Sequence, residues 1–132
     1  MIYFISGHRD ITEEEFKKNY KGLIEDAILY DKHCQFVVGD CDGADKMAMD
    51  LIAKIFTHNM HKKDIPLTIY HMYDTPRNTP EVGEFRLKGG YTSDIERDSA
   101  MTNESNWDIA FVREGKFNSG TAQNLLRRFR LK

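Results

Sequence analysis

The stretch Val37–Asp50, "VVGDCDGADKMAMD", combines an apolar strand, a glycine turn and the start of a helix. The apolar run Phe36–Val38 ends at Gly39. Apolar residues then recur at helical spacing, at Ala44, Met47, Ala48, Leu51, Ile52, Ile55 and Phe56. A short buried strand that enters an amphipathic helix through a glycine turn is typical of an α/β domain with a parallel sheet.

The aspartates of this turn raise the alternative of a calcium loop. An EF-hand loop needs a glycine at its sixth position and a bidentate glutamate at its twelfth. If Gly43 is the sixth residue, the first is Val38 and the twelfth is Met49, and neither supplies a ligand. If the loop starts at Asp40 instead, Asp45 occupies the position that requires glycine. The register therefore argues against calcium.

Strands and helices alternate along the rest of the chain. Strands are predicted at Ile2–Ile5, Leu67–Tyr70 and Ile109–Val112, and helices from the Thr12/Glu15 capping box, from Ser93 to about Met101, and after Gly120. This order predicts one Rossmann-like three-layer α/β domain over residues 1–132. The domain should have a mainly parallel sheet of four or five strands, with helices on both faces.

Residues 71–92 lack a sustained period and contain Pro76, Pro80, Gly83, Gly89 and Gly90. This stretch is predicted to be a loop insert, because segments of that length without structure are usually functional or mobile. A hairpin around "EFRLKGG" is the alternative.

Composition limits the possible partners and the compartment. The net charge of -2 leaves no general basic surface for nucleic acid, so DNA binding would rest on the basic C-terminus alone. The two cysteines are too few for a disulfide framework, and no apolar run is long enough to cross a membrane. His58 and His61 have ligand spacing but no third ligand. We expect a cytoplasmic protein without metal, cofactor or membrane segment.

Three predicted strands end in glycine turns: "ISGHRD" at 5–10, "VVGDCDGAD" at 37–45 and "FVREGKFNSGT" at 111–121. Parallel strands bring such turns to one edge of the sheet, where helix N-termini can hold an anion. The turns together predict a nucleotide ligand, although each glycine alone could simply close a tight turn. Asp42 is expected to cap a helix, and Asp40 or Asp45 to accept hydrogen bonds from ribose hydroxyls or to face away.

In order and spacing, "ISGHRD", "VVGDCDGADKMAMDLIA", "ERDSAM" and "DIAFVREGKFNSGTAQNL" resemble the signature segments of the SLOG superfamily. These Rossmann-like nucleotide-binding domains are related to the DNA-processing protein DprA and to the Lonely Guy phosphoribohydrolases. The pattern is closest to that of the small bacterial and phage members. The resemblance spans most of the chain outside residues 71–92, and implies a phosphate at Ser119–Thr121. Many relatives are dimers or larger, so it also implies a homo-oligomer.

The resemblance implies two alternative functions. The first is binding of a nucleotide or nucleotide-derived ligand, as a sensor or sequestering module. The alternative is hydrolysis of the N-glycosidic bond of a nucleoside monophosphate, with Arg97 and Asp45 as catalytic residues. The expected ligand-binding residues are Ser6, Gly7, His8, Arg9, Gly39, Gly43, Asp45, Arg97, Ser119, Gly120 and Thr121.

Two positions depart from the family pattern. Asn124 stands where the phosphoribohydrolases carry a glutamate, and Asp98 where the family usually has asparagine. An amide cannot act as a general base, so a hydrolase would need a carboxylate from Asp45, Asp98 or Glu104. Arg97 has a simpler alternative role, as an exposed ion-pair partner of Asp94. His8 could contact the ligand or bond the backbone of its turn.

Overall fold

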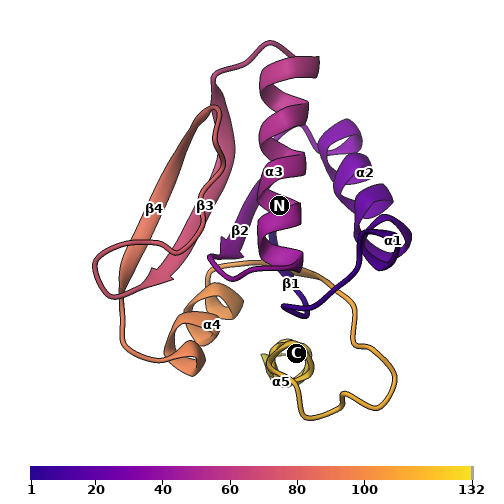
Figure 1. Ribbon diagram of the computed structural model, residues 1–132, viewed down its shortest axis with the longest axis vertical. Helices are drawn as coiled ribbons and strands as arrows, with labels where there is room; N and C mark the ends of the chain where they lie inside the picture. The colour runs from indigo at the N-terminus through magenta and orange to yellow at the C-terminus, as the bar shows by residue number, and fades with distance from the viewer. Residues whose placement is uncertain (132) are drawn as a thin grey trace.

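The computed structural model describes residues 1–131, which form one five-stranded sheet in the order β4-β3-β2-β1-β5 (Figure 1). The strands are β1 (Ile2–Ser6), β2 (Gln35–Gly39), β3 (Asp64–Met72), β4 (Glu84–Tyr91) and β5 (Trp107–Ala110). Each neighbouring pair is parallel. All strands therefore present their carboxyl ends at the same edge of the sheet.

Helices cover both faces of the sheet, as the sequence predicts. They are α1 (Glu13–Phe16), α2 (Gly22–Tyr30), α3 (Ala44–Lys54), α4 (Asp94–Asn103) and α5 (Gly120–Leu131), with π-helical segments η1 (Lys17–Lys21) and η2 (Ile55–Asn59). The capping box of Thr12 and Glu15 opens α1, and Ser93 caps α4. None of the helices in residues 1–131 has the length and apolar character needed to cross a membrane.

The core follows the two-residue period of the strands. Ile5, Val38 and Ile69 pack on the face that α1, α2 and α3 cover. Phe4, Val37 and Tyr70 point the opposite way and pack with Met101 of α4. The strands are buried on both faces, which explains why β1 and β2 read as continuous apolar runs rather than as alternating ones.

The prediction of a loop over residues 71–92 is wrong for Glu84–Tyr91, which forms β4. This strand pairs with β3 in parallel, so the hairpin alternative is also wrong. β4 is the outermost strand, and most of its side chains are exposed, including Arg86 and Leu87. An edge strand needs little apolar patterning and is commonly protected by charged side chains, so its sequence resembles a loop.

The fifth strand is displaced from its predicted position. The sequence predicts a strand at Ile109–Val112, whereas β5 spans Trp107–Ala110 and its first residue, Trp107, is half-exposed. Hydrogen bonding to β1 sets this register, with Tyr3 opposite Trp107 and Ile5 opposite Ile109. Pairing with a neighbouring strand is not encoded in the local apolar pattern, which explains the shift.

Candidate functional site

A cavity of about 300 Å³ lies at the carboxyl edge of the sheet, between the first two turns, α4 and the start of α5. Every ligand-binding residue expected from the sequence lines it except Gly43. The structure adds residues that the sequence analysis did not assign to the ligand: Phe4, Cys41, Asp94, Asp98, Met101 and Asn124. The three glycine turns therefore meet around one enclosed space.

Gly43 joins the first two turns instead of lining the cavity. It has a φ of +76°, and a Cβ there would collide with the backbone carbonyls of His8 and Arg9. The next amide, that of Ala44, donates to the His8 carbonyl at 3.1 Å. Gly43 therefore does not line the cavity, and its close approach is to the backbone of the first turn.

Arg97 occupies the centre of the site and is only 4% exposed. Its guanidinium lies 3.0 Å from Asp40, 3.2 Å from Asp98 and 3.4 Å from Asp94. The alternative role is therefore right about the ion pair with Asp94 and wrong about the exposure of Arg97. Because carboxylates already surround the guanidinium, a ligand phosphate would have to compete with them for its N–H groups.

Asp40 lies between two arginines and is 1% exposed. Arg77, from the loop that connects β3 to β4, donates its backbone N–H at 2.8 Å and its Nη2 at 3.0 Å to this carboxylate. Burial alone would raise the pKa of Asp40, but the hydrogen bonds from Arg77 and the charge of Arg97 hold that pKa below its ordinary value. Asp40 does not line the cavity, so its role is to position both arginines.

Asp42 does not cap α3, contrary to the expectation. Gly43 is the N-cap residue, and no side chain bonds the first turn of α3 from that position. The Asp42 carboxylate instead accepts a hydrogen bond from Asn78 Nδ2 at 2.9 Å, and the same amide donates to the Asp40 carbonyl. Because α3 begins at Ala44, the capping position belongs to Gly43 and not to Asp42.

Two further carboxyl groups, Asp45 and Asp98, line the cavity itself. Asp45 accepts the Cys41 backbone N–H at 3.2 Å, and burial raises its pKa to about 7 despite the charge of Arg97. Burial also raises the pKa of Asp98, against hydrogen bonds from Arg97 and Asn124. Repulsion from the Asp98 and Asp40 carboxylates adds to the rise in the pKa of Asp45, so this carboxyl group favours holding a proton up to near neutral pH.

Sequence reasoning did not place Asp98 and Asn124 together, yet both line the cavity, from α4 and α5, and the Asn124 side chain favours the ionised form of Asp98. The available signal was that both residues depart from the SLOG pattern. Asp98 stands in place of an asparagine, and Asn124 in place of a glutamate. Glu104, the remaining candidate carboxylate, lies outside the cavity and bonds Lys88 and Tyr70 Oη.

His8 and Arg9 differ in how firmly they are held. His8 is buried, and its Nε2 accepts a hydrogen bond from the backbone N–H of Arg113 at 2.8 Å. This bond joins the first glycine turn to the third. Burial and the nearby Arg113 charge lower its pKa, which favours the neutral ring. Arg9 is exposed and lies 3.6 Å from Asp94, which leaves it free to turn toward a ligand at the mouth of the cavity.

The start of α5 presents unpaired donors to the cavity. Ser119 Oγ accepts the N–H of Ala122 at 3.2 Å and so caps the helix. Within residues 1–131, the amides of Gly120 and Thr121 donate to no protein acceptor. Ser6 Oγ, on the cavity wall, is likewise buried without a hydrogen-bond partner. Free helix amides beside a buried hydroxyl suit an anionic or polar ligand.

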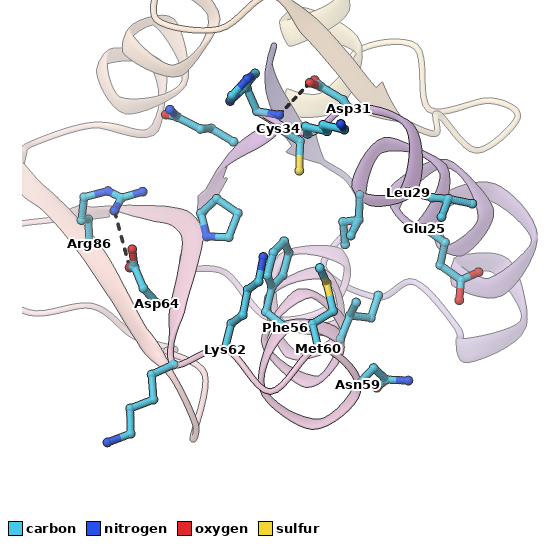
Figure 2. A pocket seen from close by; sticks show the side chains of 17 residues that line it. Glu25, Leu29, Asp31, Cys34, Phe56, Asn59, Met60, Lys62, Asp64 and Arg86 are labelled. Carbon is cyan, nitrogen blue, oxygen red and sulfur yellow. Dashed lines mark hydrogen bonds and ion pairs between the residues drawn. The ribbon is translucent and has the colours of Figure 1, made fainter.

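A larger groove of about 1340 Å³ lies at the opposite, amino edge of the sheet (Figure 2). The end of α2, η2 and the start of β3 form its walls, with Phe56 and Met60 among the lining residues. Its charged groups include the weak pair of Arg86 and Asp64 at 4.0 Å. The buried side-chain polar atoms without partners in residues 1–131 are in Ser6 and Thr102, neither of which lines this groove. The smaller cavity is therefore the better candidate.

Two arginines of the basic C-terminus, which was the support for DNA binding, are engaged within the protein. Arg128 donates to Asp108 at 3.2 Å and to the Ser105 carbonyl at 2.7 Å. Arg127 donates to Asn124 Oδ1. Separately, the described residues contain no group of three or more His, Cys, Asp or Glu side chains placed to hold a metal ion.

Comparisons of the chain with known protein families, with characterised proteins and with solved structures give no match. The site is therefore interpreted from its own geometry.

The raised pKa of Asp45 predicts that stability falls as pH rises from about 4 to about 7. In that interval the folded state holds a proton on Asp45 that the unfolded chain has lost, so raising the pH favours unfolding. Asp45→Asn removes this titration. The free energy of unfolding of the variant minus that of the wild type should therefore increase by about 2 kcal/mol when the pH is raised from about 5 to about 8.

Urea unfolding at both pH values measures this difference. The matched control is Asp26→Asn, at an exposed position on α2, which should follow the wild-type pH dependence. An equal offset between Asp45→Asn and wild type at both pH values would show that Asp45 does not carry the effect.

Proposed function

We propose that the protein binds a nucleotide or nucleotide-derived ligand in the cavity at the carboxyl edge of its sheet, as a sensor or sequestering module. The observation that carries the proposal is the start of α5, where Gly120 and Thr121 line the cavity and their amides have no protein acceptor. Such amides, at the positive end of a helix dipole, suit a phosphate group.

The remaining walls support a ribose next to that phosphate. Asp45 and Asp98 offer carboxyl oxygens that can accept hydrogen bonds from sugar hydroxyls, and the unpaired Ser6 hydroxyl adds a further partner. These carboxyl groups would repel a second phosphate deep in the cavity. Because about 300 Å³ is at the small end of ligand pockets, the space suits a mononucleotide better than a dinucleotide.

Gly120→Pro tests the phosphate contact at a single N–H group. Ser119 caps α5, so Gly120 is the first helical residue, a position where proline is well tolerated. The variant should bind a nucleoside monophosphate at least ~10-fold more weakly, because a charge-assisted hydrogen bond is lost. Binding of the corresponding nucleoside, which lacks the phosphate, should be unchanged. Calorimetry with a panel of monophosphates and NAD-derived nucleotides measures both.

Gly120→Ala is the matched control, since it keeps the N–H and its Cβ would meet nothing within 4 Å. It should bind like the wild type. If proline and alanine weaken the monophosphate equally, the phosphate does not contact this amide. If the wild type binds no member of the panel, the nucleotide proposal itself fails.

The second candidate, N-glycosidic hydrolysis, is favoured by the Asp45 and Asp98 pair in the cavity. In this reaction water adds to the sugar carbon as the bond to the base breaks, and the base leaves with a proton. Asp45, whose pKa is raised to about 7, is suited to donate that proton, and Asp98 to stabilise the developing positive charge as a carboxylate. The carboxylate that the SLOG pattern has on the last helix would then come from α4.

Chromatography for free base after incubation with the panel separates the two candidates. Release of base by the wild type, lost in Asp98→Asn while the monophosphate still binds, would support hydrolysis. Binding without any release of base would leave only the sensor or sequestering role.

A further inference from the structure

The loop that connects β3 to β4 is fastened to the second glycine turn and to the start of α3. Three consecutive residues of this loop make the contacts, and we call them the strap (Arg77, Asn78 and Thr79). Asn78 Nδ2 donates to the Asp40 carbonyl at 2.9 Å, and the Thr79 carbonyl accepts a hydrogen bond from Lys46 Nζ at 3.2 Å. The strap therefore braces, from outside, a turn that forms one wall of the cavity.

The Arg77 side chain shares the Asp40 carboxylate with Arg97. Oδ1 of Asp40 accepts hydrogen bonds from Arg77 Nη2 and from Arg97 Nη1, each at 3.0 Å. Among the described residues, Oδ2 accepts only from Arg77, from its backbone N–H at 2.8 Å and from its Nε at 3.4 Å. Without this side chain, a single backbone N–H would keep Oδ2 from turning toward Arg97, and arginine favours a carboxylate that offers both oxygens.

The second arginine also changes the balance of charge around the cavity. The guanidinium of Arg97 faces three carboxylates, those of Asp40, Asp94 and Asp98. Water can screen Asp94, whose side chain is 51% exposed, but not Asp40, which is 1% exposed. A buried carboxylate needs a cation in contact with it, and Arg77 supplies one from the outer side. Arg97 therefore does not have to neutralise Asp40 alone.

We propose that Arg77 is a positioning residue for an anionic ligand. Through Asp40 it holds Arg97 in place and leaves part of the Arg97 charge to attract a phosphate-bearing compound into the cavity. Arg77 does not line the cavity, and 45% of its side chain is exposed, so it acts through Asp40 and Arg97. The inference rests on the proposed function, because it concerns the same cavity. The strap would then set how strongly the site prefers a nucleotide to an uncharged nucleoside.

Arg77→Met tests the positioning role, since methionine removes the guanidinium and keeps the backbone N–H. The probes are the monophosphates of adenosine, guanosine, cytidine and uridine, with the matching nucleosides, and calorimetry gives their dissociation constants. The monophosphate that binds the wild type most tightly should bind the variant ~10-fold more weakly, the scale of losing one partly screened charge. Its nucleoside should change by less than ~2-fold, because an uncharged compound responds little to that charge.

Arg86→Met is the matched control, with the same loss of charge. The side chain of Arg86 is 53% exposed, against 45% for Arg77, and lines the groove at the opposite edge of the sheet. This variant should bind both compounds like the wild type. Arg77→Lys keeps the charge without the bidentate contact, so it should bind the monophosphate within ~3-fold of the wild type.

Salt separates an effect of charge from a general loss of structure. Raising the salt concentration from about 0.01 M to about 1 M shortens the screening length from about 30 Å to about 3 Å. The difference between Arg77→Met and the wild type in monophosphate affinity should therefore shrink. A difference that stays the same across this range would show that the Arg77 charge does not act on the ligand.

The route through Asp40 is tested in an Asp40→Asn background. There Arg77→Met should change monophosphate binding by less than ~2-fold, because the carboxylate that transmits the effect is absent. A full ~10-fold loss in that background would contradict the route. The double variant also serves if Arg77→Met alone fails to fold, since it has neither the buried carboxylate nor the need for its second cation.

The outcomes distinguish this inference from the proposed function. If the wild type binds a monophosphate and Arg77→Met binds it equally well, the positioning role is overturned and the proposed function stands. Equal weakening of the monophosphate and its nucleoside would also overturn the positioning role. If the wild type binds none of the probes, the proposed function fails, and the inference fails with it.

Discussion

Replacement of Gly43 by alanine is expected to lower the free energy of unfolding by at least ~3 kcal/mol. Its φ of +76° is unfavourable for an L-residue, and the added Cβ would collide with the carbonyls of His8 and Arg9. Backbone atoms cannot rotate away as a flexible side chain can. The two turns must therefore separate, which also breaks the bond from the Ala44 N–H to the His8 carbonyl.

Gly22→Ala is the control for this prediction, because Gly22 lies within the continuous helical run from α1 to α2. A Cβ at Gly22 would meet nothing within 4 Å, and the residue follows a helical Lys21. Alanine there should raise stability by ~0.5–1 kcal/mol. Urea unfolding of both variants measures the contrast. A loss below ~1 kcal/mol for Gly43→Ala would mean that the turns can separate at little cost.

Arg97→Met is expected to lower the free energy of unfolding by ~3–5 kcal/mol near neutral pH. Methionine preserves much of the side-chain length but removes the positive charge that faces Asp40, Asp94 and Asp98. The buried carboxylates of Asp40 and Asp98 would each lose a counterion, and Asp40 would keep only Arg77. The control is Arg86→Met, which removes an exposed arginine 4.0 Å from Asp64 and should change stability by less than ~0.5 kcal/mol.

The loss in Arg97→Met should persist down to about pH 4 and diminish only below it. The pKa of Asp40 is lower in the folded protein than in the unfolded chain. The ionised carboxylate therefore contributes to the free energy of unfolding above its unfolded pKa, and this contribution is lost as the pH falls through its folded pKa. Urea unfolding at several pH values measures this trend, and a loss independent of pH would point to packing instead of charge. Because Arg97 supports the fold, Gly120→Pro is the cleaner probe of ligand binding.

The three turns could be predicted because each has a local signal. An apolar run followed by glycine and a helical period marks a strand, turn and helix in any single stretch of sequence. Parallel pairing then brings the turns together, which is why nearly all of the expected residues line one cavity. Gly43 was assigned to the ligand because sequence shows the need for glycine, but not which atoms approach it.

The residues that the sequence analysis missed depend on contacts between distant segments. Arg77 reaches Asp40 from a loop that was expected to be an unstructured insert, and Asp98 meets Asn124 from another helix. Strand β4 was missed for a related reason. A charged edge strand is recognised by its pairing with β3 and not by the apolar pattern of its own sequence.

By itself, the sequence determined the class of fold and the edge of the sheet where the glycine turns gather, because periodicity and turn chemistry act over a few neighbouring residues. Only the tertiary structure decided how Arg97 is surrounded by Asp40, Asp94 and Asp98, and that Leu125, Leu126 and Phe129 of α5 are exposed. The amphipathic pattern of α5 shows that an apolar side exists. Which side faces the protein is set by contacts with other elements, among them the ion pair of Arg128 with Asp108 of β5.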